Sequence, residues 1–273
     1  MNAMTAAALP KSGADATCSR AASGEALVLG QRPSTVTWAL PEEVPVALQF
    51  NSSPFTVMMA TPANLQDFAI GIAIAEGIVK SARDINAVLV LPVENGIAVD
   101  IAVDEKLLDT GKLGRRSIEG RTGCGLCGVE DIAAAVKPLQ PVHAHTAPTA
   151  EAILKAAKAL PALQPMNLHN RTVHAAAWVD FNGNIILVRE DVGRHNALDK
   201  LIGALARVEM DVSSGFVLMT SRCSYELVQK CAFAGIGAIA TVSAPTALAL
   251  DLARASKVYL AALGAGGVVV FNS

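Results

Sequence analysis

The sequence predicts an α/β protein made of a three-layer α/β sandwich preceded by a smaller N-terminal α+β lobe. Two observations lead to this prediction. In the second half, apolar runs typical of buried strands alternate with helical patterns of roughly 10 to 14 residues, the order expected of parallel strands joined by crossover helices. In the first half, alternating apolar and polar residues indicate strands and a hairpin around one helical stretch.

The composition excludes several classes of function. Of the 273 residues, 52% are hydrophobic and 17% are charged, which is typical of a globular protein with a sizeable core. A net charge of −2 argues against nucleic acid as a partner, because attraction to a polyanion requires an excess of positive charge. An anion site would therefore be local, built from a few arginines and backbone N–H groups.

Cysteine usage and hydropathy bear on the compartment. The five cysteines are an odd number in a long chain, and the N-terminus lacks a basic start followed by a continuous apolar run, so we expect a cytoplasmic protein. From Cys231 to Leu250 there are twenty uncharged residues, enough to cross a bilayer. Glycine, serine and proline interrupt this stretch, which favours a buried strand followed by a buried helix, and we expect no membrane association.

Four parts of the chain differ in pattern. Residues 1–35 lack helical or alternating periodicity and are predicted to form a flexible tail. Residues 36–105 are predicted to form the small α+β lobe, and residues 148–273 the larger α/β domain. Between them, residues 106–147 show little regular pattern, and so long an irregular segment is usually functional or disordered.

The small lobe is predicted from strand patterns on both sides of one helix. The runs VALQF and FTVMMA are strand-like, and a helix follows Thr61-Pro62, where threonine suits the N-cap and proline the first turn. Ala87 to Val103 then alternates as a hairpin, with Glu94-Asn95-Gly96 as its turn.

The larger domain is predicted to begin with a helix and an antiparallel hairpin and to continue with alternating helices and strands. The hairpin is indicated by Asn182-Gly183 between two apolar runs. The elements in order are helix Thr149–Leu160, strand Val173–Asp180, strand Asn184–Arg189, helix Arg194–Arg207, strand Phe216–Thr220, helix Ser224–Ala234, strand Gly237–Val242, helix Pro245–Ser256 and strand Val258–Leu263.

Three predicted strand ends carry conspicuous polar residues. The segments 190–196 (EDVGRHN), 220–224 (TSRCS) and 243–246 (SAPT) each join a strand to the next helix. The carboxyl ends of neighbouring parallel strands share one edge of a sheet, so these segments would converge there. They would then frame a pocket for an anionic or nucleotide-like group.

Helix capping is the simpler explanation for each segment taken alone. Asp191, Ser221 and Thr246 are all good N-cap residues. Arg194 and Arg222 favour a shared ligand site instead, because an arginine side chain has no acceptor with which to cap a helix.

The irregular segment contains two cysteines at the spacing of metal ligands. Cys124 and Cys127 stand in the glycine-rich run RTGCGLCGVE. With His143 and His145 they give C-x2-C followed by H-x-H, which is close to a structural zinc site. The histidines are separated by fewer residues than zinc fingers use, and no second C-x2-C exists, which speaks against this interpretation.

A zinc deaminase is a second interpretation. The helix, hairpin, helix and strand order of the larger domain is that of the cytidine deaminase fold, whose enzymes carry H-x-E and P-C-x-x-C. At the matching positions this chain has His195-Asn196-Ala197 and Ser221-Arg222-Cys223-Ser224, so the catalytic glutamate and one cysteine are absent. We therefore expect a cytidine deaminase-like sandwich without deaminase chemistry.

Sulfur chemistry is the third interpretation. A thiolate attacks sulfur only when it is deprotonated and accessible, and nearby arginines lower the pKa of a thiol. Arg121 supplies such a charge near Cys124, and Cys127 is placed where a resolving thiol could attack a persulfide or a mixed disulfide. The position between two lobes favours carrying sulfur to a distant acceptor over dithiol exchange.

Several long motifs, in order along most of the chain beyond the tail, resemble the FdhD family, the sulfurtransferases required for formate dehydrogenase activity. Together they are far more specific than a lone C-x-x-C. The motifs are EEVPVAL (42–48), VMMATP (57–62), RTGCGLCGVE (121–130), VHAAAW (173–178), EDVGRHNALDKLIG (190–203), SRCSYELVQK (221–230) and VSAPTALA (242–249).

The resemblance implies a cytoplasmic homodimer that acts as a sulfurtransferase. Such a protein takes persulfide sulfur from a cysteine desulfurase and passes it to the molybdenum or tungsten bis(pterin guanine dinucleotide) cofactor before the cofactor enters formate dehydrogenase. The first cysteine of the family's pair carries the persulfide and corresponds to Cys124, and Cys127 would assist transfer. The molybdenum cofactor is thus a bound acceptor, and no permanent metal is expected.

The resemblance also implies a cofactor-binding stretch near the C-terminus. It corresponds to the sequence LGAGGV, which consists of Leu263, Gly264, Ala265, Gly266, Gly267 and Val268.

The polar strand ends fit the same ligand. Arg194 and Arg222 would meet its pyrophosphate, and Asp191 or Glu190 would accept the two adjacent N–H groups of guanine. Further candidates for pocket contacts are Ser221, His174 and His195.

A protein of another class fits the same sequence. It is a non-enzymatic chaperone that binds the pterin cofactor and delivers it, with Cys124 and Cys127 holding a structural zinc ion. Measurements of zinc content and of persulfide labelling would distinguish this chaperone from the sulfurtransferase.

Overall fold

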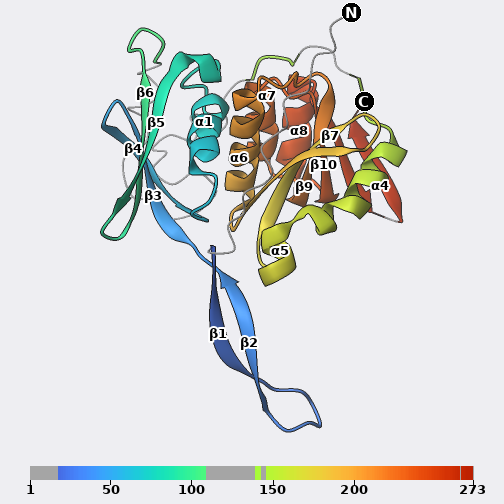
Figure 1. Cartoon of the computed structure of the whole chain (residues 1–273). Coiled ribbons are helices and arrows are strands. Elements are labelled where there is room, and N and C mark those ends of the chain that lie inside the picture. The colour runs from blue at the N-terminus through green and yellow to red at the C-terminus, as the bar shows by residue number, and fades with distance from the viewer. Residues whose placement is uncertain (1–17, 109–138, 143–145, 265, 273) are drawn as a thin grey trace, which may run out of the picture.

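The computed structural model describes residues 18–108, 139–142, 146–264 and 266–272. They form two lobes that pack side by side, with a two-stranded arm that projects away from both (Figure 1). Cys124, Cys127, His143 and His145 lie outside the described residues.

The small lobe is a four-stranded sheet with one helix on its inner face. Strand order is β4-β3-β6-β5, with β3 and β6 parallel and the outer pairs antiparallel. The predicted hairpin with its turn at residues 94–95 is confirmed as β5 and β6. The elements are β3 (Val44–Phe50), β4 (Ser53–Ala60), α1 (Leu65–Ala75), the 3-10 turn η2 (Ala82–Asp84), β5 (Ile85–Val93) and β6 (Gly96–Val103).

The larger lobe is a six-stranded mixed sheet in the order β12-β11-β10-β9-β7-β8. Strands β9, β10 and β11 are parallel, and β7 runs antiparallel to both β8 and β9. The elements are α4 (Ala150–Ala159), η3 (Leu160–Leu163), α5 (Pro165–Asn170), β7 (His174–Asp180), β8 (Ile185–Asp191), α6 (Arg194–Arg207), β9 (Gly215–Arg222), α7 (Tyr225–Phe233), β10 (Ala238–Ser243), α8 (Ala247–Ser256), β11 (Tyr259–Gly264) and β12 (Gly267–Asn272).

Side chains alternate between two cores on the two faces of this sheet. Trp178 and Met219 point to the face covered by α6, α7 and α8, whereas Phe216 and Ala240 face α4, which contributes Ile153. Helix, sheet and helix therefore form three layers, visible in Figure 1. The prediction of a mixed α/β protein is confirmed, and its cytidine deaminase-like character stays a prediction.

The lobes meet where α1 crosses α6. A Cβ atom added to Gly71 would lie 1.7 Å from the carbonyl oxygen of Asp199, and one added to Gly203 would lie 1.8 Å from that of Asp67. The two backbones therefore approach so closely that only glycine fits at either position. Because α1 is covered by its own sheet on one side and by α6 on the other, most of its residues are buried.

The start of α1 differs from the prediction. The helix begins at Leu65 and its N-cap is Asn64, a residue in the left-handed conformation (φ 55°), not Thr61. The side-chain and backbone groups of Thr61 bond instead to the larger lobe, and this connection displaces the helix start by several residues.

The predicted tail is wrong from residue 19 onward. Residues Ser19–Ala26 (β1) and Ser34–Pro41 (β2) pair as an antiparallel hairpin, which forms the projecting arm. The sequence also did not predict β12, which pairs antiparallel with β11.

Candidate functional site

The carboxyl edge of the larger sheet gathers most of the predicted site. Because β7 runs antiparallel to both β8 and β9, strands β8 to β11 all end at this edge. Arg222, the last residue of β9, pairs with Ser243 of β10, so these two junctions are adjacent. Strand β7 separates them from the third junction, and its first residue, His174, pairs with Asp191. We call the edge formed by His174, Arg194, His195, Arg222 and Ser243 the rim.

Two arginines give the rim its positive charge. Arg222 is exposed, and within the described part of the chain no carboxylate pairs with it or with Arg194. The Nε atom of Arg194 is buried and has no hydrogen-bond partner among the described residues. Unpaired guanidinium groups at the carboxyl ends of parallel strands suit an anionic ligand.

His195 lies in the first turn of α6 and faces the start of α7. Its Nε2 atom is 3.4 Å from Oγ of Ser224 and 3.8 Å from Oε2 of Glu226, and its side chain is almost fully buried. Burial by itself would raise the pKa of Glu226, but the His195 imidazole and the Ser224 hydroxyl outweigh it and hold this pKa at about 2. Glu226 therefore faces His195 as a carboxylate, a partner that sequence reasoning missed.

His174 is half-buried between the two arginine-bearing junctions. Burial lowers its pKa, and the nearby positive charge of Arg194 lowers it further. The imidazole is therefore neutral at pH 7 in the absence of a ligand. An anion bound at the rim would oppose both effects and favour the charged form.

The lowered pKa of His174 predicts how stability depends on pH. The folded state holds this group neutral, so the stabilisation is complete above the unfolded pKa of about 6.5 and is lost as pH falls from that value through the lower pKa of the folded state. We expect His174→Gln to lose less unfolding free energy than the wild type between pH 7 and pH 5. Denaturant titrations at several pH values test this, with His169→Gln on α5 as the control. Parallel pH profiles of His174→Gln and the wild type would contradict it.

Asp191 lies buried where the two lobes meet. It is fully buried, and Lys200 donates from Nζ to its Oδ2 at 2.6 Å. Its oxygens also accept from the backbone N–H groups of Thr61 and Gly193 and from Nδ2 of Asn196. These contacts place Asp191 in the connection between the lobes, and its part in guanine recognition stays a prediction.

Glu190, the alternative base-binding residue, is equally occupied. It accepts from the backbone N–H groups of Met166 and Asn167, both at 2.9 Å, at the start of α5. Its burial raises its pKa, while these N–H groups act in the opposite direction. Ser221 is also buried, and its hydroxyl donates to the carbonyl oxygen of Arg222 at 3.0 Å.

The glycine-rich stretch near the C-terminus forms the turn between the last two strands. Leu263 pairs with Val268, and Gly264 pairs with Gly267. Gly266 adopts φ +78°, a conformation that favours glycine. Since β11 ends at the carboxyl edge, this turn lies on the same edge of the sheet as Arg222, though two strands away. Ala265 is outside the described residues.

Three of the five cysteines are buried and unsuited to nucleophilic chemistry. Cys18, Cys223 and Cys231 are each at most 4% exposed. Burial raises the pKa of Cys223 to about 12, and that of Cys231 still further. The two remaining cysteines are Cys124 and Cys127, which lie outside the described residues together with His143 and His145, so the zinc interpretation stays open there.

Outside the rim, the described residues contain neither a metal cluster nor a membrane-spanning helix, and the arginines of the cavity at the end of α6 are already paired. The described ranges contain no group of three or more histidine, cysteine or acidic side chains placed to hold a metal ion, and no helix within them is long and apolar enough to cross a membrane. A cavity of about 350 Å³ lies between η2, β5 and the end of α6. Its arginines, Arg83 and Arg207, are paired with Glu209 and Asp67.

The fold and the rim define a class of protein. It is a two-lobed α/β protein whose larger sheet carries, among the described residues, two arginines without a carboxylate partner at one edge, and whose sequence contains a C-x-x-C pair besides the three buried cysteines. Within this class the chain belongs to the FdhD/NarQ family, whose model matches residues 41–270.

Proteins named sulfur carrier protein FdhD are similar over most of the chain. The protein from Xanthomonas euvesicatoria is 46% identical over 85% of this chain and 82% of its own length. The proteins from Bordetella petrii and Cupriavidus necator are 47% and 48% identical, over 80% and 84% of this chain and 79% and 80% of their own.

A solved structure shares the fold. It is the crystal structure of a Desulfotalea psychrophila protein assigned to the formate dehydrogenase accessory proteins. The two superpose with a TM-score of 0.72 at 24% identity, over 94% of this chain and 97% of that one.

Proposed function

We propose that this protein is a sulfur carrier that serves formate dehydrogenase. Cys124 takes a sulfane sulfur from a cysteine desulfurase and delivers it to the molybdenum or tungsten bis(pterin guanine dinucleotide) cofactor. The observation that carries the proposal is the distribution of thiols. Every cysteine in the described residues is buried, which leaves the pair Cys124 and Cys127 for chemistry in a chain 46% identical to a sulfur carrier protein.

The first transfer is a thiol exchange at sulfur. The Cys124 thiolate attacks the terminal sulfur of the desulfurase persulfide, a new S–S bond forms on Cys124, and the desulfurase cysteine leaves as a thiolate. No oxidant is needed, because the sulfane sulfur keeps its oxidation state.

The second transfer uses the resolving thiol. The Cys127 thiolate attacks the inner sulfur of the Cys124 persulfide, forms a disulfide with it and releases the terminal sulfur as hydrosulfide, which becomes a ligand of the acceptor metal. A dithiol reductant of the thioredoxin class then restores both cysteines.

The acceptor's charged nucleotide ends would bind at the rim. Arg194 and Arg222 are available for phosphate oxygens, and His174 becomes a third cation when a phosphate approaches. Guanosine diphosphate is a suitable probe for this part of the ligand, because it carries the same base and pyrophosphate.

Arg222→Ala is expected to weaken binding of guanosine diphosphate about tenfold, because a charge-assisted contact with phosphate is worth about 1.5 to 3 kcal/mol. Arg222 is exposed and unpaired within the described part, so thermal stability should not change. Titration calorimetry measures the affinity. Arg254→Ala is the matched control, because it removes the same charge at the far end of α8. Equal affinities for the two variants would refute a phosphate site at the rim.

Formate dehydrogenase activity tests the proposed function. In a host that lacks its own carrier, the wild type should restore activity and Cys124→Ala should not, while Cys223→Ala should behave like the wild type because that thiol is buried and protonated. A Cys124→Ala protein that restores full activity would end the proposal. One zinc ion per chain, lost in Cys127→Ser, would instead support the cofactor-delivery chaperone.

A further inference from the structure

Helices α6 and α7 carry two facing pairs of polar residues at the end of their contact that is nearer the rim. The helices lie side by side on one face of the larger sheet (Figure 1). Helix α6 contributes His195 and Asp199, and α7 contributes Glu226 and Lys230. Residues four apart share one face of a helix, so the four side chains make two successive contacts. His195 meets Glu226, and Asp199 meets Lys230.

The second contact fixes the position of α7 on α6. Nζ of Lys230 donates to both carboxylate oxygens of Asp199, at 2.8 and 2.9 Å, and both side chains are almost fully buried. Nζ also lies 3.6 Å from a carboxylate oxygen of Glu76, at the end of α1. A shift of one helix along the other would leave a buried charge without its partner, which is strongly destabilising. Glu226 is therefore held beside His195.

Glu226 has a carboxylate oxygen that lacks a hydrogen-bond donor. Its Oε2 atom is buried and has no hydrogen-bond partner among the described residues, although Nε2 of His195 faces it at 3.8 Å. Buried polar atoms are rarely left in this state. A movement of the imidazole by about 1 Å would turn the contact into a hydrogen bond. The arrangement is thus one step short of a closed histidine–carboxylate pair.

The other ring nitrogen of His195, Nδ1, also has no hydrogen-bond partner in the described part of the chain. The two nitrogens lie on different edges of the ring, so an imidazole held at Nε2 presents Nδ1 elsewhere. The preceding residue, Arg194, has a buried Nε atom that is likewise without a partner. Two neighbouring nitrogens without partners at the start of α6 indicate a shared acceptor, and a bound phosphate group would supply its oxygens.

We propose that Glu226 is a positioning residue for the ligand of the rim. It holds His195 at Nε2, so that Nδ1 donates to a phosphate oxygen bound beside Arg194. Glu226 itself does not contact the ligand. This role rests on the proposed function, because the phosphate belongs to the nucleotide end of the cofactor.

The proposed contacts require a proton on each ring nitrogen in the complex. The carboxylate accepts one at Nε2 and the phosphate accepts the other at Nδ1, so His195 is positively charged when the ligand is bound. Arg194, His174 on β7 and the positive end of α6 oppose this charge. Asp199 favours it only weakly, because a lysine of α7 neutralises that carboxylate. Glu226 is therefore the group that allows the imidazole to be charged at neutral pH.

Titration calorimetry with guanosine diphosphate tests this role on the full chain. Glu226→Gln keeps the size of the side chain and an acceptor oxygen but removes the charge. It should weaken binding about tenfold at about pH 8, because the ring then keeps its second proton less readily. The loss should fall below about threefold at about pH 6, where protons are more abundant.

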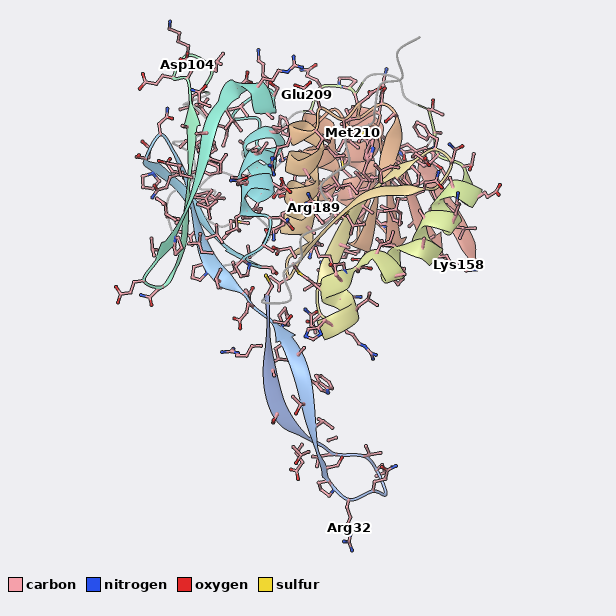
Figure 2. All side chains as sticks on the ribbon, in the orientation of Figure 1. Arg32, Asp104, Lys158, Arg189, Glu209 and Met210 are labelled. Carbon is pink, nitrogen blue, oxygen red and sulfur yellow. The ribbon has the colours of Figure 1, made fainter. Side chains whose placement is uncertain are left out.

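Glu209→Gln is the matched control. It removes the same charge beyond the far end of α6, where Glu209 pairs with Arg83 (Figure 2). A helix of 14 residues is roughly 20 Å long, so this charge is distant from the rim. Glu209→Gln should bind guanosine diphosphate like the wild type at both pH values.

A double variant shows whether Glu226 acts through His195. His195→Gln should weaken binding at least as much as Glu226→Gln, and adding Glu226→Gln to it should have no further effect. A purely structural role would instead weaken binding in both backgrounds and equally at both pH values.

Nitrogen NMR of protein labelled at its histidines gives a readout on the wild type. The chain has five histidines, and the signals of His195 are those that change in Glu226→Gln. On addition of guanosine diphosphate, both of its ring nitrogens should shift to the values of a protonated imidazole.

Three results would overturn the proposal. They are a Glu226→Gln protein that binds like the wild type at about pH 8, a loss of the same size at about pH 6, and His195 signals that do not respond to the ligand. A wild type that binds no guanosine diphosphate would refute the nucleotide site itself together with this role. Sulfur uptake by Cys124 is measured without the nucleotide, so failure of the sulfur-carrier function would be recognised separately.

Discussion

Gly203→Ala is expected to lower the unfolding free energy by about 3 kcal/mol, because its new Cβ atom would lie 1.8 Å from the carbonyl oxygen of Asp67. The obstacle is backbone, so no side chain can rotate away, and α1 and α6 must separate. Gly71 meets α6 in the same way, and Gly71→Ala should therefore act alike. Helix propensity alone would make the alanine variants more stable, because it favours alanine over glycine by about 1 kcal/mol. The expected loss of stability is therefore opposite in sign to the effect of helix propensity.

Thermal unfolding and denaturant titration measure this loss, which corresponds to a melting temperature roughly 8 °C lower. Gly24→Ala is the control, since a Cβ atom there meets nothing within 4 Å. It should change stability by less than about 0.5 kcal/mol. If Gly203→Ala is as stable as the wild type, the close crossing of α1 and α6 is not present in solution.

Lys200→Met is expected to lower the unfolding free energy by about 3 to 5 kcal/mol, because it leaves the buried Asp191 carboxylate without its cation. Both side chains of this pair are fully buried, and Nζ of Lys200 also donates to the carbonyl oxygen of Thr61 at 3.0 Å. The pair thus ties β8 and α6 of the larger lobe to the small lobe. The double variant Asp191→Asn with Lys200→Met should be more stable than Lys200→Met alone, because it removes the isolated charge.

The exposed pair Arg83 and Glu209 supplies the comparison. Its side chains are 78% and 63% exposed, so Arg83→Met should cost less than about 1 kcal/mol. Equal losses for Lys200→Met and Arg83→Met in denaturant titrations would show that the buried pair does not hold the lobes together.

The larger lobe could be predicted closely from the sequence. Helix α6 begins at Arg194 and ends at Arg207 as predicted, because its apolar spacing and the glycine before it are local signals. Strands β8 and β9 run two residues further than predicted, since the polar residues at their ends still pair with neighbouring strands. The convergence of the polar segments at the rim could be predicted from these elements, because the carboxyl ends of neighbouring parallel strands lie at one edge of the sheet.

The connections between the lobes could not be predicted in this way. Thr61 and Asp191 are 130 residues apart, and no local pattern shows that Thr61 bonds there instead of capping a helix. Lys200 did carry a signal, because a charged residue on an otherwise apolar helix face indicates a buried partner. The arm was missed because alanine, glycine and serine dominate β1, so that strand shows little alternation of apolar and polar residues.

The most direct test of the proposed function is the mass of Cys124 after incubation with a cysteine desulfurase and cysteine. Mass spectrometry of the intact protein and of the peptide that contains residues 121–130 should show a gain of about 32 Da, one sulfur atom, on Cys124. The gain should disappear on treatment with a dithiol reductant, and it should be absent from Cys124→Ala. A wild-type protein that gains no sulfur under conditions in which the desulfurase itself becomes persulfidated would contradict the assignment of this chain as a sulfur carrier.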